Sequence, residues 1–69
     1  GSRALKKGMK GPDVTEMKSL LTKKGYKVRD TTDEYNDEVE LFVKDFQSKH
    51  DVPPDGIAGP LTIYYLKYR

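Results

Sequence analysis

Apolar residues recur with helical spacing in the first third of the chain. The spacing of three, three and one residues places them on one face of a helix. They are Val14, Met17, Leu20 and Leu21. Proline is pre-organised for the first position of a helix, and glycine suits the residue just beyond its end. Because Pro12 precedes this face and Gly25 follows it, we predict a helix over about residues 12–24.

A second helix is predicted from Asn36 to near Lys49. Asparagine is a good N-cap, and prolines at positions 53 and 54 disfavour any continuation of the helix. The apolar face of this helix consists of Val39, Phe42, Val43 and Phe46. A third helix is predicted to begin at Gly59-Pro60 and to run to the C-terminus, with Tyr65 and Leu66 facing inward.

The starts of the three helices resemble one another. They read Gly-Pro-Asp-Val from residue 11, Asn-Asp-Glu-Val from residue 36 and Gly-Pro-Leu-Thr from residue 59. In this alignment Thr62 matches Val39, and Leu66 matches Val43. The chain therefore carries a short internal quasi-repeat, with starts 23 to 25 residues apart.

No segment alternates for long enough to predict a strand. We therefore predict an all-α fold, a compact bundle of three helices with turn-rich connections and with the third helix packed across the first two. The predicted core is Leu5, Val14, Met17, Leu20, Leu21, Tyr26, Val39, Phe42, Val43, Phe46, Val52, Ile57 and Leu66.

With 69 residues and 7.9 kDa, the chain is long enough for one domain with a small core. The opening Gly1-Ser2 is typical of a remnant of tag removal, so we assign residues 1–3 to a tag remnant and flank and residues 4–69 to a single module. No stretch is long and apolar enough to predict a membrane-spanning helix. We expect a monomer.

Charge is distributed unevenly along the chain. Residues 1–29 hold nine Lys and Arg against two acids, and residues 30–56 hold two lysines against nine acids. One interpretation is a basic face that meets a polyanion such as nucleic acid. The other is that the two halves attract each other within the bundle, and we favour it because small domains usually carry mixed surface charge.

The sequence offers little for catalysis, metal binding or a cofactor. It has no cysteine and a single histidine, His50, at a helix end where a cation is favoured. The segment that follows Asp55-Gly56 lacks the alternating acids and the final glutamate of a calcium loop. We therefore predict no catalytic residue, no metal and no cofactor.

The candidates for ligand binding lie in two turns and on the last helix. In the turn that precedes the third helix, we expect Asp55 to accept hydrogen bonds from backbone amides and Gly56 to take a positive φ. We expect Ile57 to insert into the core. Thr62 is expected to bond within this turn or the first turn of its own helix, and Gln47 to bridge loop backbone, with a ligand as the alternative partner of both.

Tyrosines are the aromatic candidates, because their rings stack on sugars or peptide side chains and their hydroxyls form hydrogen bonds. If Tyr65 faces the core, Tyr64 and Tyr68 share an outer face, four residues apart. Ordinary partial burial is the alternative for each tyrosine.

Two strings of residues resemble the three-helix type of the peptidoglycan-binding domain family. The first is Leu5-x-x-Gly8-x-x-Gly11-x-Asp13-Val14-x-x-Met17-x-x-Leu20-Leu21-x-x-x-Gly25-Tyr26. The second is Phe46-Gln47, then Val52-Pro53-x-Asp55-Gly56-Ile57-x-Gly59-x-x-Thr62-x-x-x-Leu66. Together they cover residues 5–66.

The chain departs from the family pattern at the start of the second helix. Family members usually have Asp-Gly-x-Phe-Gly-x-x-Thr there, whereas this chain has Tyr35 for the aromatic residue, Asn36 for the second glycine and Val39 for the threonine. Asparagine tolerates left-handed and capping conformations, so the turn can survive. The chain also has Met17-Lys18 where the family often has Leu-Gln, and Phe42 where a small residue is usual.

The resemblance implies non-catalytic binding of bacterial peptidoglycan, through its peptide stem or its glycan, by a module covalently attached to a cell-wall enzyme. The enzymes implied include amidases, muramidases and phage endolysins. It implies action outside the cell, at the wall or in the periplasm, with a phage origin possible. The ligand-binding candidates are Tyr35, Asn36, Gln47, Asp55, Gly56, Thr62, Tyr64, Tyr65 and Tyr68. A small helical nucleic-acid-binding or protein-interaction domain is the alternative.

Overall fold

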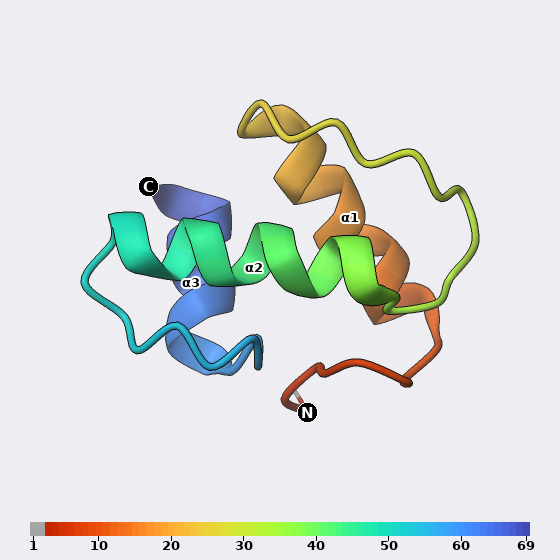
Figure 1. The fold of residues 1–69 in the computed structure, drawn as a ribbon, viewed down its shortest axis with the longest axis horizontal. Helices are drawn as coiled ribbons and strands as arrows, with labels where there is room; N and C mark the ends of the chain where they lie inside the picture. Colours follow the sequence, from red (N-terminus) through yellow and green to blue (C-terminus); the bar gives the residue numbers. More distant parts are fainter. Residues whose placement is uncertain (1–2) are drawn as a thin grey trace.

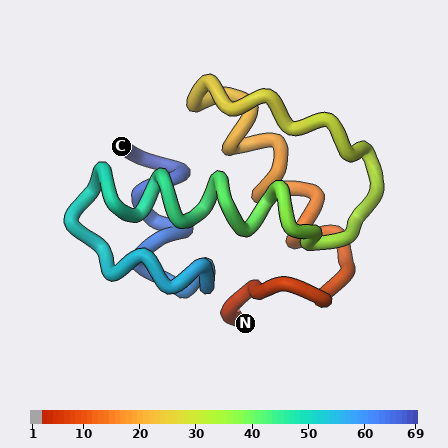
Figure 2. Tube along the Cα trace, in the orientation of Figure 1, coloured from red at the N-terminus to blue at the C-terminus, as the bar shows by residue number. Residues whose placement is uncertain are grey.

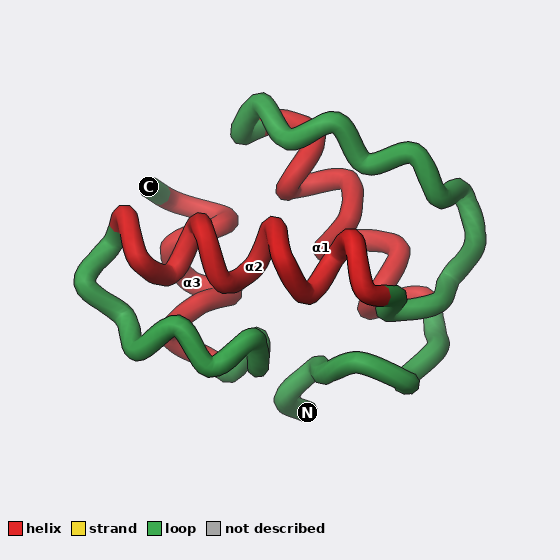
Figure 3. The backbone as a smooth tube through the Cα atoms, viewed as in Figure 1, coloured by secondary structure: helices red, strands yellow, loops and turns green. Residues whose placement is uncertain are grey.

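The computed structural model describes residues 3–69, which form three helices joined by long loops (Figure 1). The helices are α1 (Pro12–Lys23), α2 (Asp37–Lys49) and α3 (Pro60–Tyr68). Figure 3 shows only helices and loops along the described chain, and two isolated β-bridges are the only extended pairings in it. The all-α prediction and all three helices are confirmed, and the expected remnant at residues 1 and 2 lies outside the described residues.

The predicted caps account for the ends of the helices. Pro12 and Pro60 occupy the first turns of α1 and α3, and the Asn36 side chain accepts a hydrogen bond from the Val39 amide at 3.0 Å at the start of α2. After α1, Gly25 has a φ of 100°, in the left-handed region that favours glycine. Its amide donates to the Thr22 carbonyl, which ends the helix.

The arrangement of the helices differs from the expected one. In the view of Figure 1, α2 runs across the front of both other helices, and α1 packs against α2 and α3. The predicted arrangement, with α3 across the other two helices, is therefore wrong. The reason is that α3 has only nine residues, whereas α2 has thirteen and is long enough to span both neighbours.

The N-terminal segment joins the loops that precede α2 and α3. We call residues 24–36 the first loop and residues 51–59 the second loop; both can be followed in Figure 2. Leu5 and Ala58 exchange two backbone hydrogen bonds, of 3.1 and 2.7 Å. Further along the same segment, the Gly8 amide donates to the Tyr35 carbonyl and the Tyr35 amide donates to the Met9 carbonyl. Two loops that are distant in sequence are thus held by one short extended segment.

The core is built mostly from the predicted residues. Eight of the predicted thirteen are among the most buried apolar side chains, together with Tyr35 and Ala58, which we had not placed there. They are Leu5, Val14, Met17, Leu21, Val39, Val43, Phe46 and Leu66. Val52 is 9% exposed, while Leu20, Tyr26 and Phe42 are partly buried and pack against the cluster.

Ile57 is the core prediction that is wrong. Its side chain is 40% exposed. The Ile57 amide donates to the Asp55 carboxylate, and its carbonyl accepts a bond from the buried Gln47 side chain. Because both backbone groups of Ile57 turn toward the protein, its side chain is left at the surface, and the neighbouring Ala58 enters the core instead.

Candidate ligand-binding site

The second loop is organised by the side chain of Gln47, which projects from α2 and is 1% exposed. Its Nε2 donates to the Asp55 carboxylate at 3.1 Å, to the Ile57 carbonyl at 2.9 Å and to the Thr62 hydroxyl at 3.1 Å. Its Oε1 accepts a bond from the Gly56 amide at 3.0 Å. The expected bridge from Gln47 to loop backbone is confirmed.

The other expectations for this turn are met in part. The Asp55 carboxylate accepts a bond from the Ile57 amide at 2.9 Å, and Gly56 has a φ of 77°. A side chain at Gly56 would also crowd Glu40 and Lys44, because a Cβ there would lie 3.0 Å from a carbon atom of each. Thr62 is 2% exposed, and its hydroxyl is bonded to Gln47 rather than within its own turn.

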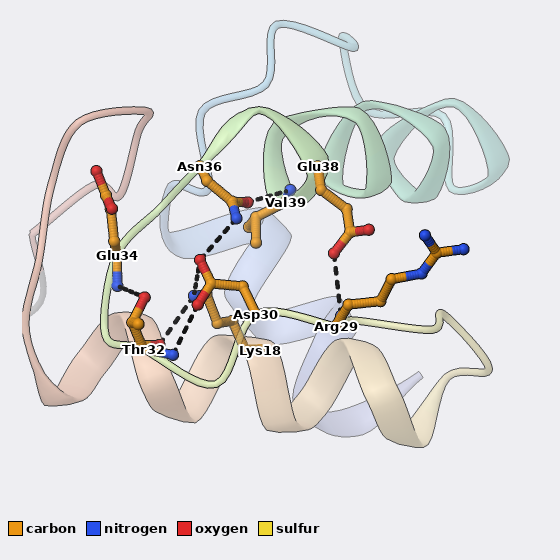
Figure 4. A network of polar contacts seen from close by, with 8 residues as sticks. All are labelled: Lys18, Arg29, Asp30, Thr32, Glu34, Asn36, Glu38 and Val39. Atoms are coloured by element: carbon orange, nitrogen blue, oxygen red, sulfur yellow. Dashed lines mark hydrogen bonds and ion pairs between the residues drawn. The ribbon is translucent and has the colours of Figure 1, made fainter.

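The first loop is organised by Lys18, which projects from α1 (Figure 4). The Lys18 side chain is only 6% exposed, and its ammonium donates to the Thr32 carbonyl at 2.9 Å and lies 3.7 Å from the Asp30 carboxylate. Asp30 also accepts bonds from the Thr32 amide and from the Asn36 side chain, both at 2.7 Å. Hydrogen bonds from Thr32, assisted by the charge of Lys18, hold the pKa of Asp30 below its usual range.

Sequence reasoning missed the role of Lys18. A lysine is rarely buried unless it is paired, so its residue type pointed to solvent. The available signal was its spacing, since Lys18 lies four residues after Val14 and three before Leu21, on the apolar face of the predicted helix. Lys18 and Gln47 each hold one of the two loops.

Tyr35 is a core residue and not a surface aromatic. Its side chain is fully buried, and its hydroxyl donates to the Gly56 carbonyl at 2.6 Å, which links the first loop to the second. Burial raises the pKa of the Tyr35 hydroxyl, so the group stays protonated and donates this bond. A buried ring has no free face, which excludes the stacking role that we had considered for it.

The other three candidate tyrosines lie on α3. We call Tyr64, Tyr65 and Tyr68 the tyrosine face. Tyr64 is 48% exposed and Tyr68 is 70% exposed, with their ring centroids 5.2 Å apart. Tyr65 is partly buried and lies 5.8 Å from Tyr64. The rings therefore form a continuous aromatic surface along the last helix.

His50 supports this surface from the end of α2. Its ring stacks on Phe46 at 4.1 Å and on Tyr65 at 5.6 Å. Its Nδ1 lies 3.0 Å from the Phe46 carbonyl, near the C-terminus of the helix. The histidine thus fixes Tyr65 relative to the core, which leaves Tyr64 and Tyr68 as the accessible members of the tyrosine face.

Charges of opposite sign meet within the fold. Lys7 pairs with Asp37 at 2.6 Å and Lys18 with Asp30 at 3.7 Å, so residues of the basic stretch are paired with residues of the acidic one.

Within residues 3–69 we find no cluster of three or more histidine, cysteine or acidic side chains arranged to hold a metal ion. Each helix in the described part of the chain is too short or too polar to cross a bilayer.

Comparison with known families decides the identity of the fold. Residues 10–66 match the family described as "Putative peptidoglycan binding domain". The chain belongs to the peptidoglycan-binding domain family. It is therefore a non-catalytic module of a kind that binds the bacterial cell wall.

Solved structures of similar sequence share the fold of this peptidoglycan-binding domain. The endolysin of Burkholderia phage AP3 is 32% identical with a TM-score of 0.89, over 96% of this chain and 25% of that chain. A peptidoglycan-binding protein from Clostridioides difficile, solved in complex with glutamine hydroxamate, is 31% identical with a TM-score of 0.88, over 93% of this chain and 40% of that one. A search of curated protein sequences finds no match.

The N-terminal domain of SleB is also similar, with 27% identity and a TM-score of 0.90. The similarity extends over 97% of this peptidoglycan-binding domain and 92% of that chain. The match to SleB is thus a match of whole domains, whereas the domain spans only a quarter of the endolysin. These similarities support cell-wall binding and give no support to a nucleic-acid-binding or protein-interaction domain.

Proposed function

We propose that this domain holds a covalently attached cell-wall hydrolase on peptidoglycan, outside the cell or in the periplasm. The support is that the same fold makes up a quarter of a phage endolysin, whose remaining length is available for other domains. An amidase, a muramidase or an endolysin of bacterial or phage origin would each fit this arrangement.

We further propose that the tyrosine face makes the principal contact with the wall. The observation that carries this proposal is the exposure of Tyr64 and Tyr68, which present adjacent rings with free faces and hydroxyls. Such rings suit stacking on sugars and hydrogen bonding to amides. Tyr65 contributes the edge of its ring and orients Tyr64.

The polar candidates have a different part in this proposal. Gln47, Thr62 and the Gly56 amide satisfy one another within the protein, and Asn36 caps α2. We therefore assign to them the shaping of the two loops. Asp55 is exposed. It is the one polar candidate in the second loop that a ligand can reach without disrupting buried hydrogen bonds.

Each domain should bind weakly, because its contact surface is small and the ordering of ligand and side chains opposes association. The polymer repeats the same units many times, however, and the attached enzyme gains from the raised local concentration. Affinity for intact wall is thus a more informative measure than affinity for one fragment.

The test is retention of the domain by insoluble sacculi stripped of teichoic acid, at low and at high salt. We expect the wild-type protein to be retained at both. The Tyr64→Ala/Tyr68→Ala double variant should bind about 30-fold more weakly, because each of the two stacking rings contributes roughly 1 kcal/mol. Leu41→Ala is the matched control, since Leu41 is 64% exposed and makes none of these aromatic contacts.

Three outcomes would contradict the proposal. Absence of wild-type retention would show that wall binding has been lost. Retention that modest salt abolishes would point to attraction between charges. An equal loss in the tyrosine and Leu41 variants would remove the tyrosine face from the mechanism.

A further inference from the structure

A pocket of about 150 Å³ lies between α1, α3 and the N-terminal segment, apart from the tyrosines considered above. Its apolar lining comes from Leu5, Met17, Leu20 and Ile63. An apolar cavity of this volume accommodates a group about the size of benzene. The pocket is therefore large enough for a short alkyl chain.

Two ion pairs also line this pocket. Arg3 pairs with Asp13 at 2.8 Å, and Lys67 pairs with Glu16 at 3.7 Å. A positive and a negative group therefore occur together twice beside an apolar floor. A ligand that carries one charge of each sign on a short alkyl chain would match this arrangement.

The Arg3–Asp13 pair is fixed by several hydrogen bonds. The guanidinium donates twice to the Asp13 carboxylate and also to the Lys10 carbonyl, while Asp13 accepts a bond from the Val14 amide. The hydrogen bond to Arg3 lowers the pKa of Asp13, and the same bond raises the pKa of Arg3. This pair shapes the pocket and has little freedom to exchange partners.

The Lys67–Glu16 pair is free to exchange partners. Its two groups lie 3.7 Å apart, and their side chains are 42% and 62% exposed. Exposed pairs of this kind contribute little to stability. A ligand's carboxylate can therefore replace Glu16 beside Lys67, and a ligand's ammonium can replace Lys67 beside Glu16, at small cost. The closeness of the two side chains requires the ligand's two charges to be close as well.

We propose that this pocket binds an amino-acid zwitterion at the end of a short alkyl chain, with its carboxylate on Lys67, its ammonium on Glu16 and its methylenes on Leu20 and Ile63. An ammonium and a carboxylate on one carbon meet the spacing of the pair, and a few methylene groups fill the apolar volume.

This inference rests on the proposed function, because peptidoglycan supplies such a group. In stem peptides built on diaminopimelate, the diamino acid ends in an ammonium and a carboxylate on one carbon wherever that end is not cross-linked. Stem peptides built on lysine end in an ammonium alone. The pocket thus selects the diaminopimelate type through its contact with Lys67.

The experiment compares two soluble tripeptides that differ only in this residue, L-alanyl-γ-D-glutamyl-meso-diaminopimelate and L-alanyl-γ-D-glutamyl-L-lysine. Binding to the intact domain is followed by NMR through the methyl signals of Leu20 and Ile63. We expect saturable shifts of both methyl groups and an affinity for the diaminopimelate peptide that is higher by up to roughly fivefold, the upper end of the range for one exposed charge contact.

Substitutions assign the contacts. Lys67→Gln should reduce the preference to near equality, and Lys67→Glu should reverse it, because two acids then face the extra carboxylate. Lys23→Gln is the matched control; it removes an exposed lysine that is absent from the pocket lining. All of these residues are exposed, so thermal unfolding of the variants should match that of the wild type.

Failure of this inference is distinguishable from failure of the proposed function. If sacculi retain the wild-type domain while both tripeptides bind equally, or shift only Tyr64 and Tyr68, the pocket assignment is overturned and wall binding stands. If sacculi do not retain the domain and neither tripeptide shifts the methyl signals, both are overturned. An unchanged preference in Lys67→Glu would also overturn the pocket assignment.

Discussion

The first loop is organised by Lys18 from α1, and the second loop by Gln47 from α2. Gln47 donates to loop carbonyl and hydroxyl oxygens and accepts from the Gly56 amide, so one neutral side chain satisfies both kinds of group. Lys18 only donates. Because its ammonium is also charged and buried, it requires an anion nearby, and the first loop provides Asp30.

The helix starts differ for the same reason. Gly59 precedes α3 without a side-chain cap, whereas Asn36 caps α2 and also donates to Asp30. The Asn36 side chain therefore connects the helix to the charged network of the first loop. Two of the departures from the family pattern, Lys18 and Asn36, therefore belong together, because both contact Asp30.

The two loops also fill the core differently while keeping the same backbone pairing. Tyr35 and Ala58 occupy corresponding positions, and both exchange hydrogen bonds with the N-terminal segment. The Tyr35 side chain reaches the Gly56 carbonyl of the second loop, whereas the small Ala58 side chain is simply buried in the core. The loops are thus complementary parts of one packing unit.

The largest expected effect is that of Gln47→Leu. The change removes four hydrogen bonds and leaves the buried Gly56 amide without this acceptor, so we expect the free energy of unfolding to fall by about 3 kcal/mol or more. Urea denaturation measures the change. A loss below about 1 kcal/mol would show that the second loop does not depend on Gln47.

The next largest effect is expected for Tyr35→Phe. The ring is retained, and the Gly56 carbonyl loses its bond from the buried hydroxyl, which should cost about 1–2 kcal/mol. Tyr64→Phe is the control, since its hydroxyl lies on an exposed residue and its loss should leave stability unchanged. Equal effects of the two variants would mean that the link between the loops contributes nothing.

A third prediction concerns the pH dependence of stability, which should distinguish the first loop, held by Lys18 and Asp30, from the second loop, held by the neutral Gln47. Because the folded-state pKa of Asp30 is lowered, the unfolded chain binds more protons in acid, and stability rises with pH through this window. The contribution is complete above about pH 4–5 and is lost as pH falls through the folded-state pKa.

The measurement for Asp30 is thermal unfolding between pH 6 and pH 2 for the wild type and for Asp30→Asn. The difference in stability between the two proteins should shrink as the pH falls. Other acids with a lowered pKa, such as Asp13 and Asp45, affect both proteins alike and cancel in this difference. A difference that stays constant with pH would remove the charge of Asp30 from the stabilisation of the first loop.

The smallest expected effect on stability comes from giving α3 the asparagine N-cap that α2 has. Gly59 has a φ of −81°, and a Cβ there meets nothing within 4 Å, so Gly59→Asn can introduce the cap that α2 already has. Asparagine exceeds glycine as an N-cap by a few tenths of a kcal/mol. We expect a gain of that size in urea denaturation, with Gly59→Ala as the control that adds a Cβ without a cap.

The helices could be predicted from the sequence because their signals are local. The apolar face of α1, the Asn36 cap and the two prolines at N-termini lie within or beside the elements that they determine. Observed bounds agree with the predicted ones to within about a residue. The turn at Asp55-Gly56 was predictable for the same reason.

The burial of Tyr35 and the exposure of Ile57 could not be predicted in this way. Neither lies in a periodic segment, and the orientation of each is decided by groups distant in the sequence. The exposure of the aromatic residues of α3 was easier to predict, because helical spacing separates the partly buried Tyr65 from the exposed Tyr64 and Tyr68. The pocket beside Lys67 depends on α1 and the N-terminal segment together, and no single stretch of sequence contains it.

The pairing of Leu5 with Ala58 has a mechanical consequence. A pull on the N-terminal end of the domain loads this pairing and the Arg3–Asp13 contact before it stretches any helix. Peeling the segment away would release both loops and open one wall of the pocket while the three helices were still folded. Tension on this segment would therefore reach the pocket before it reached the helices.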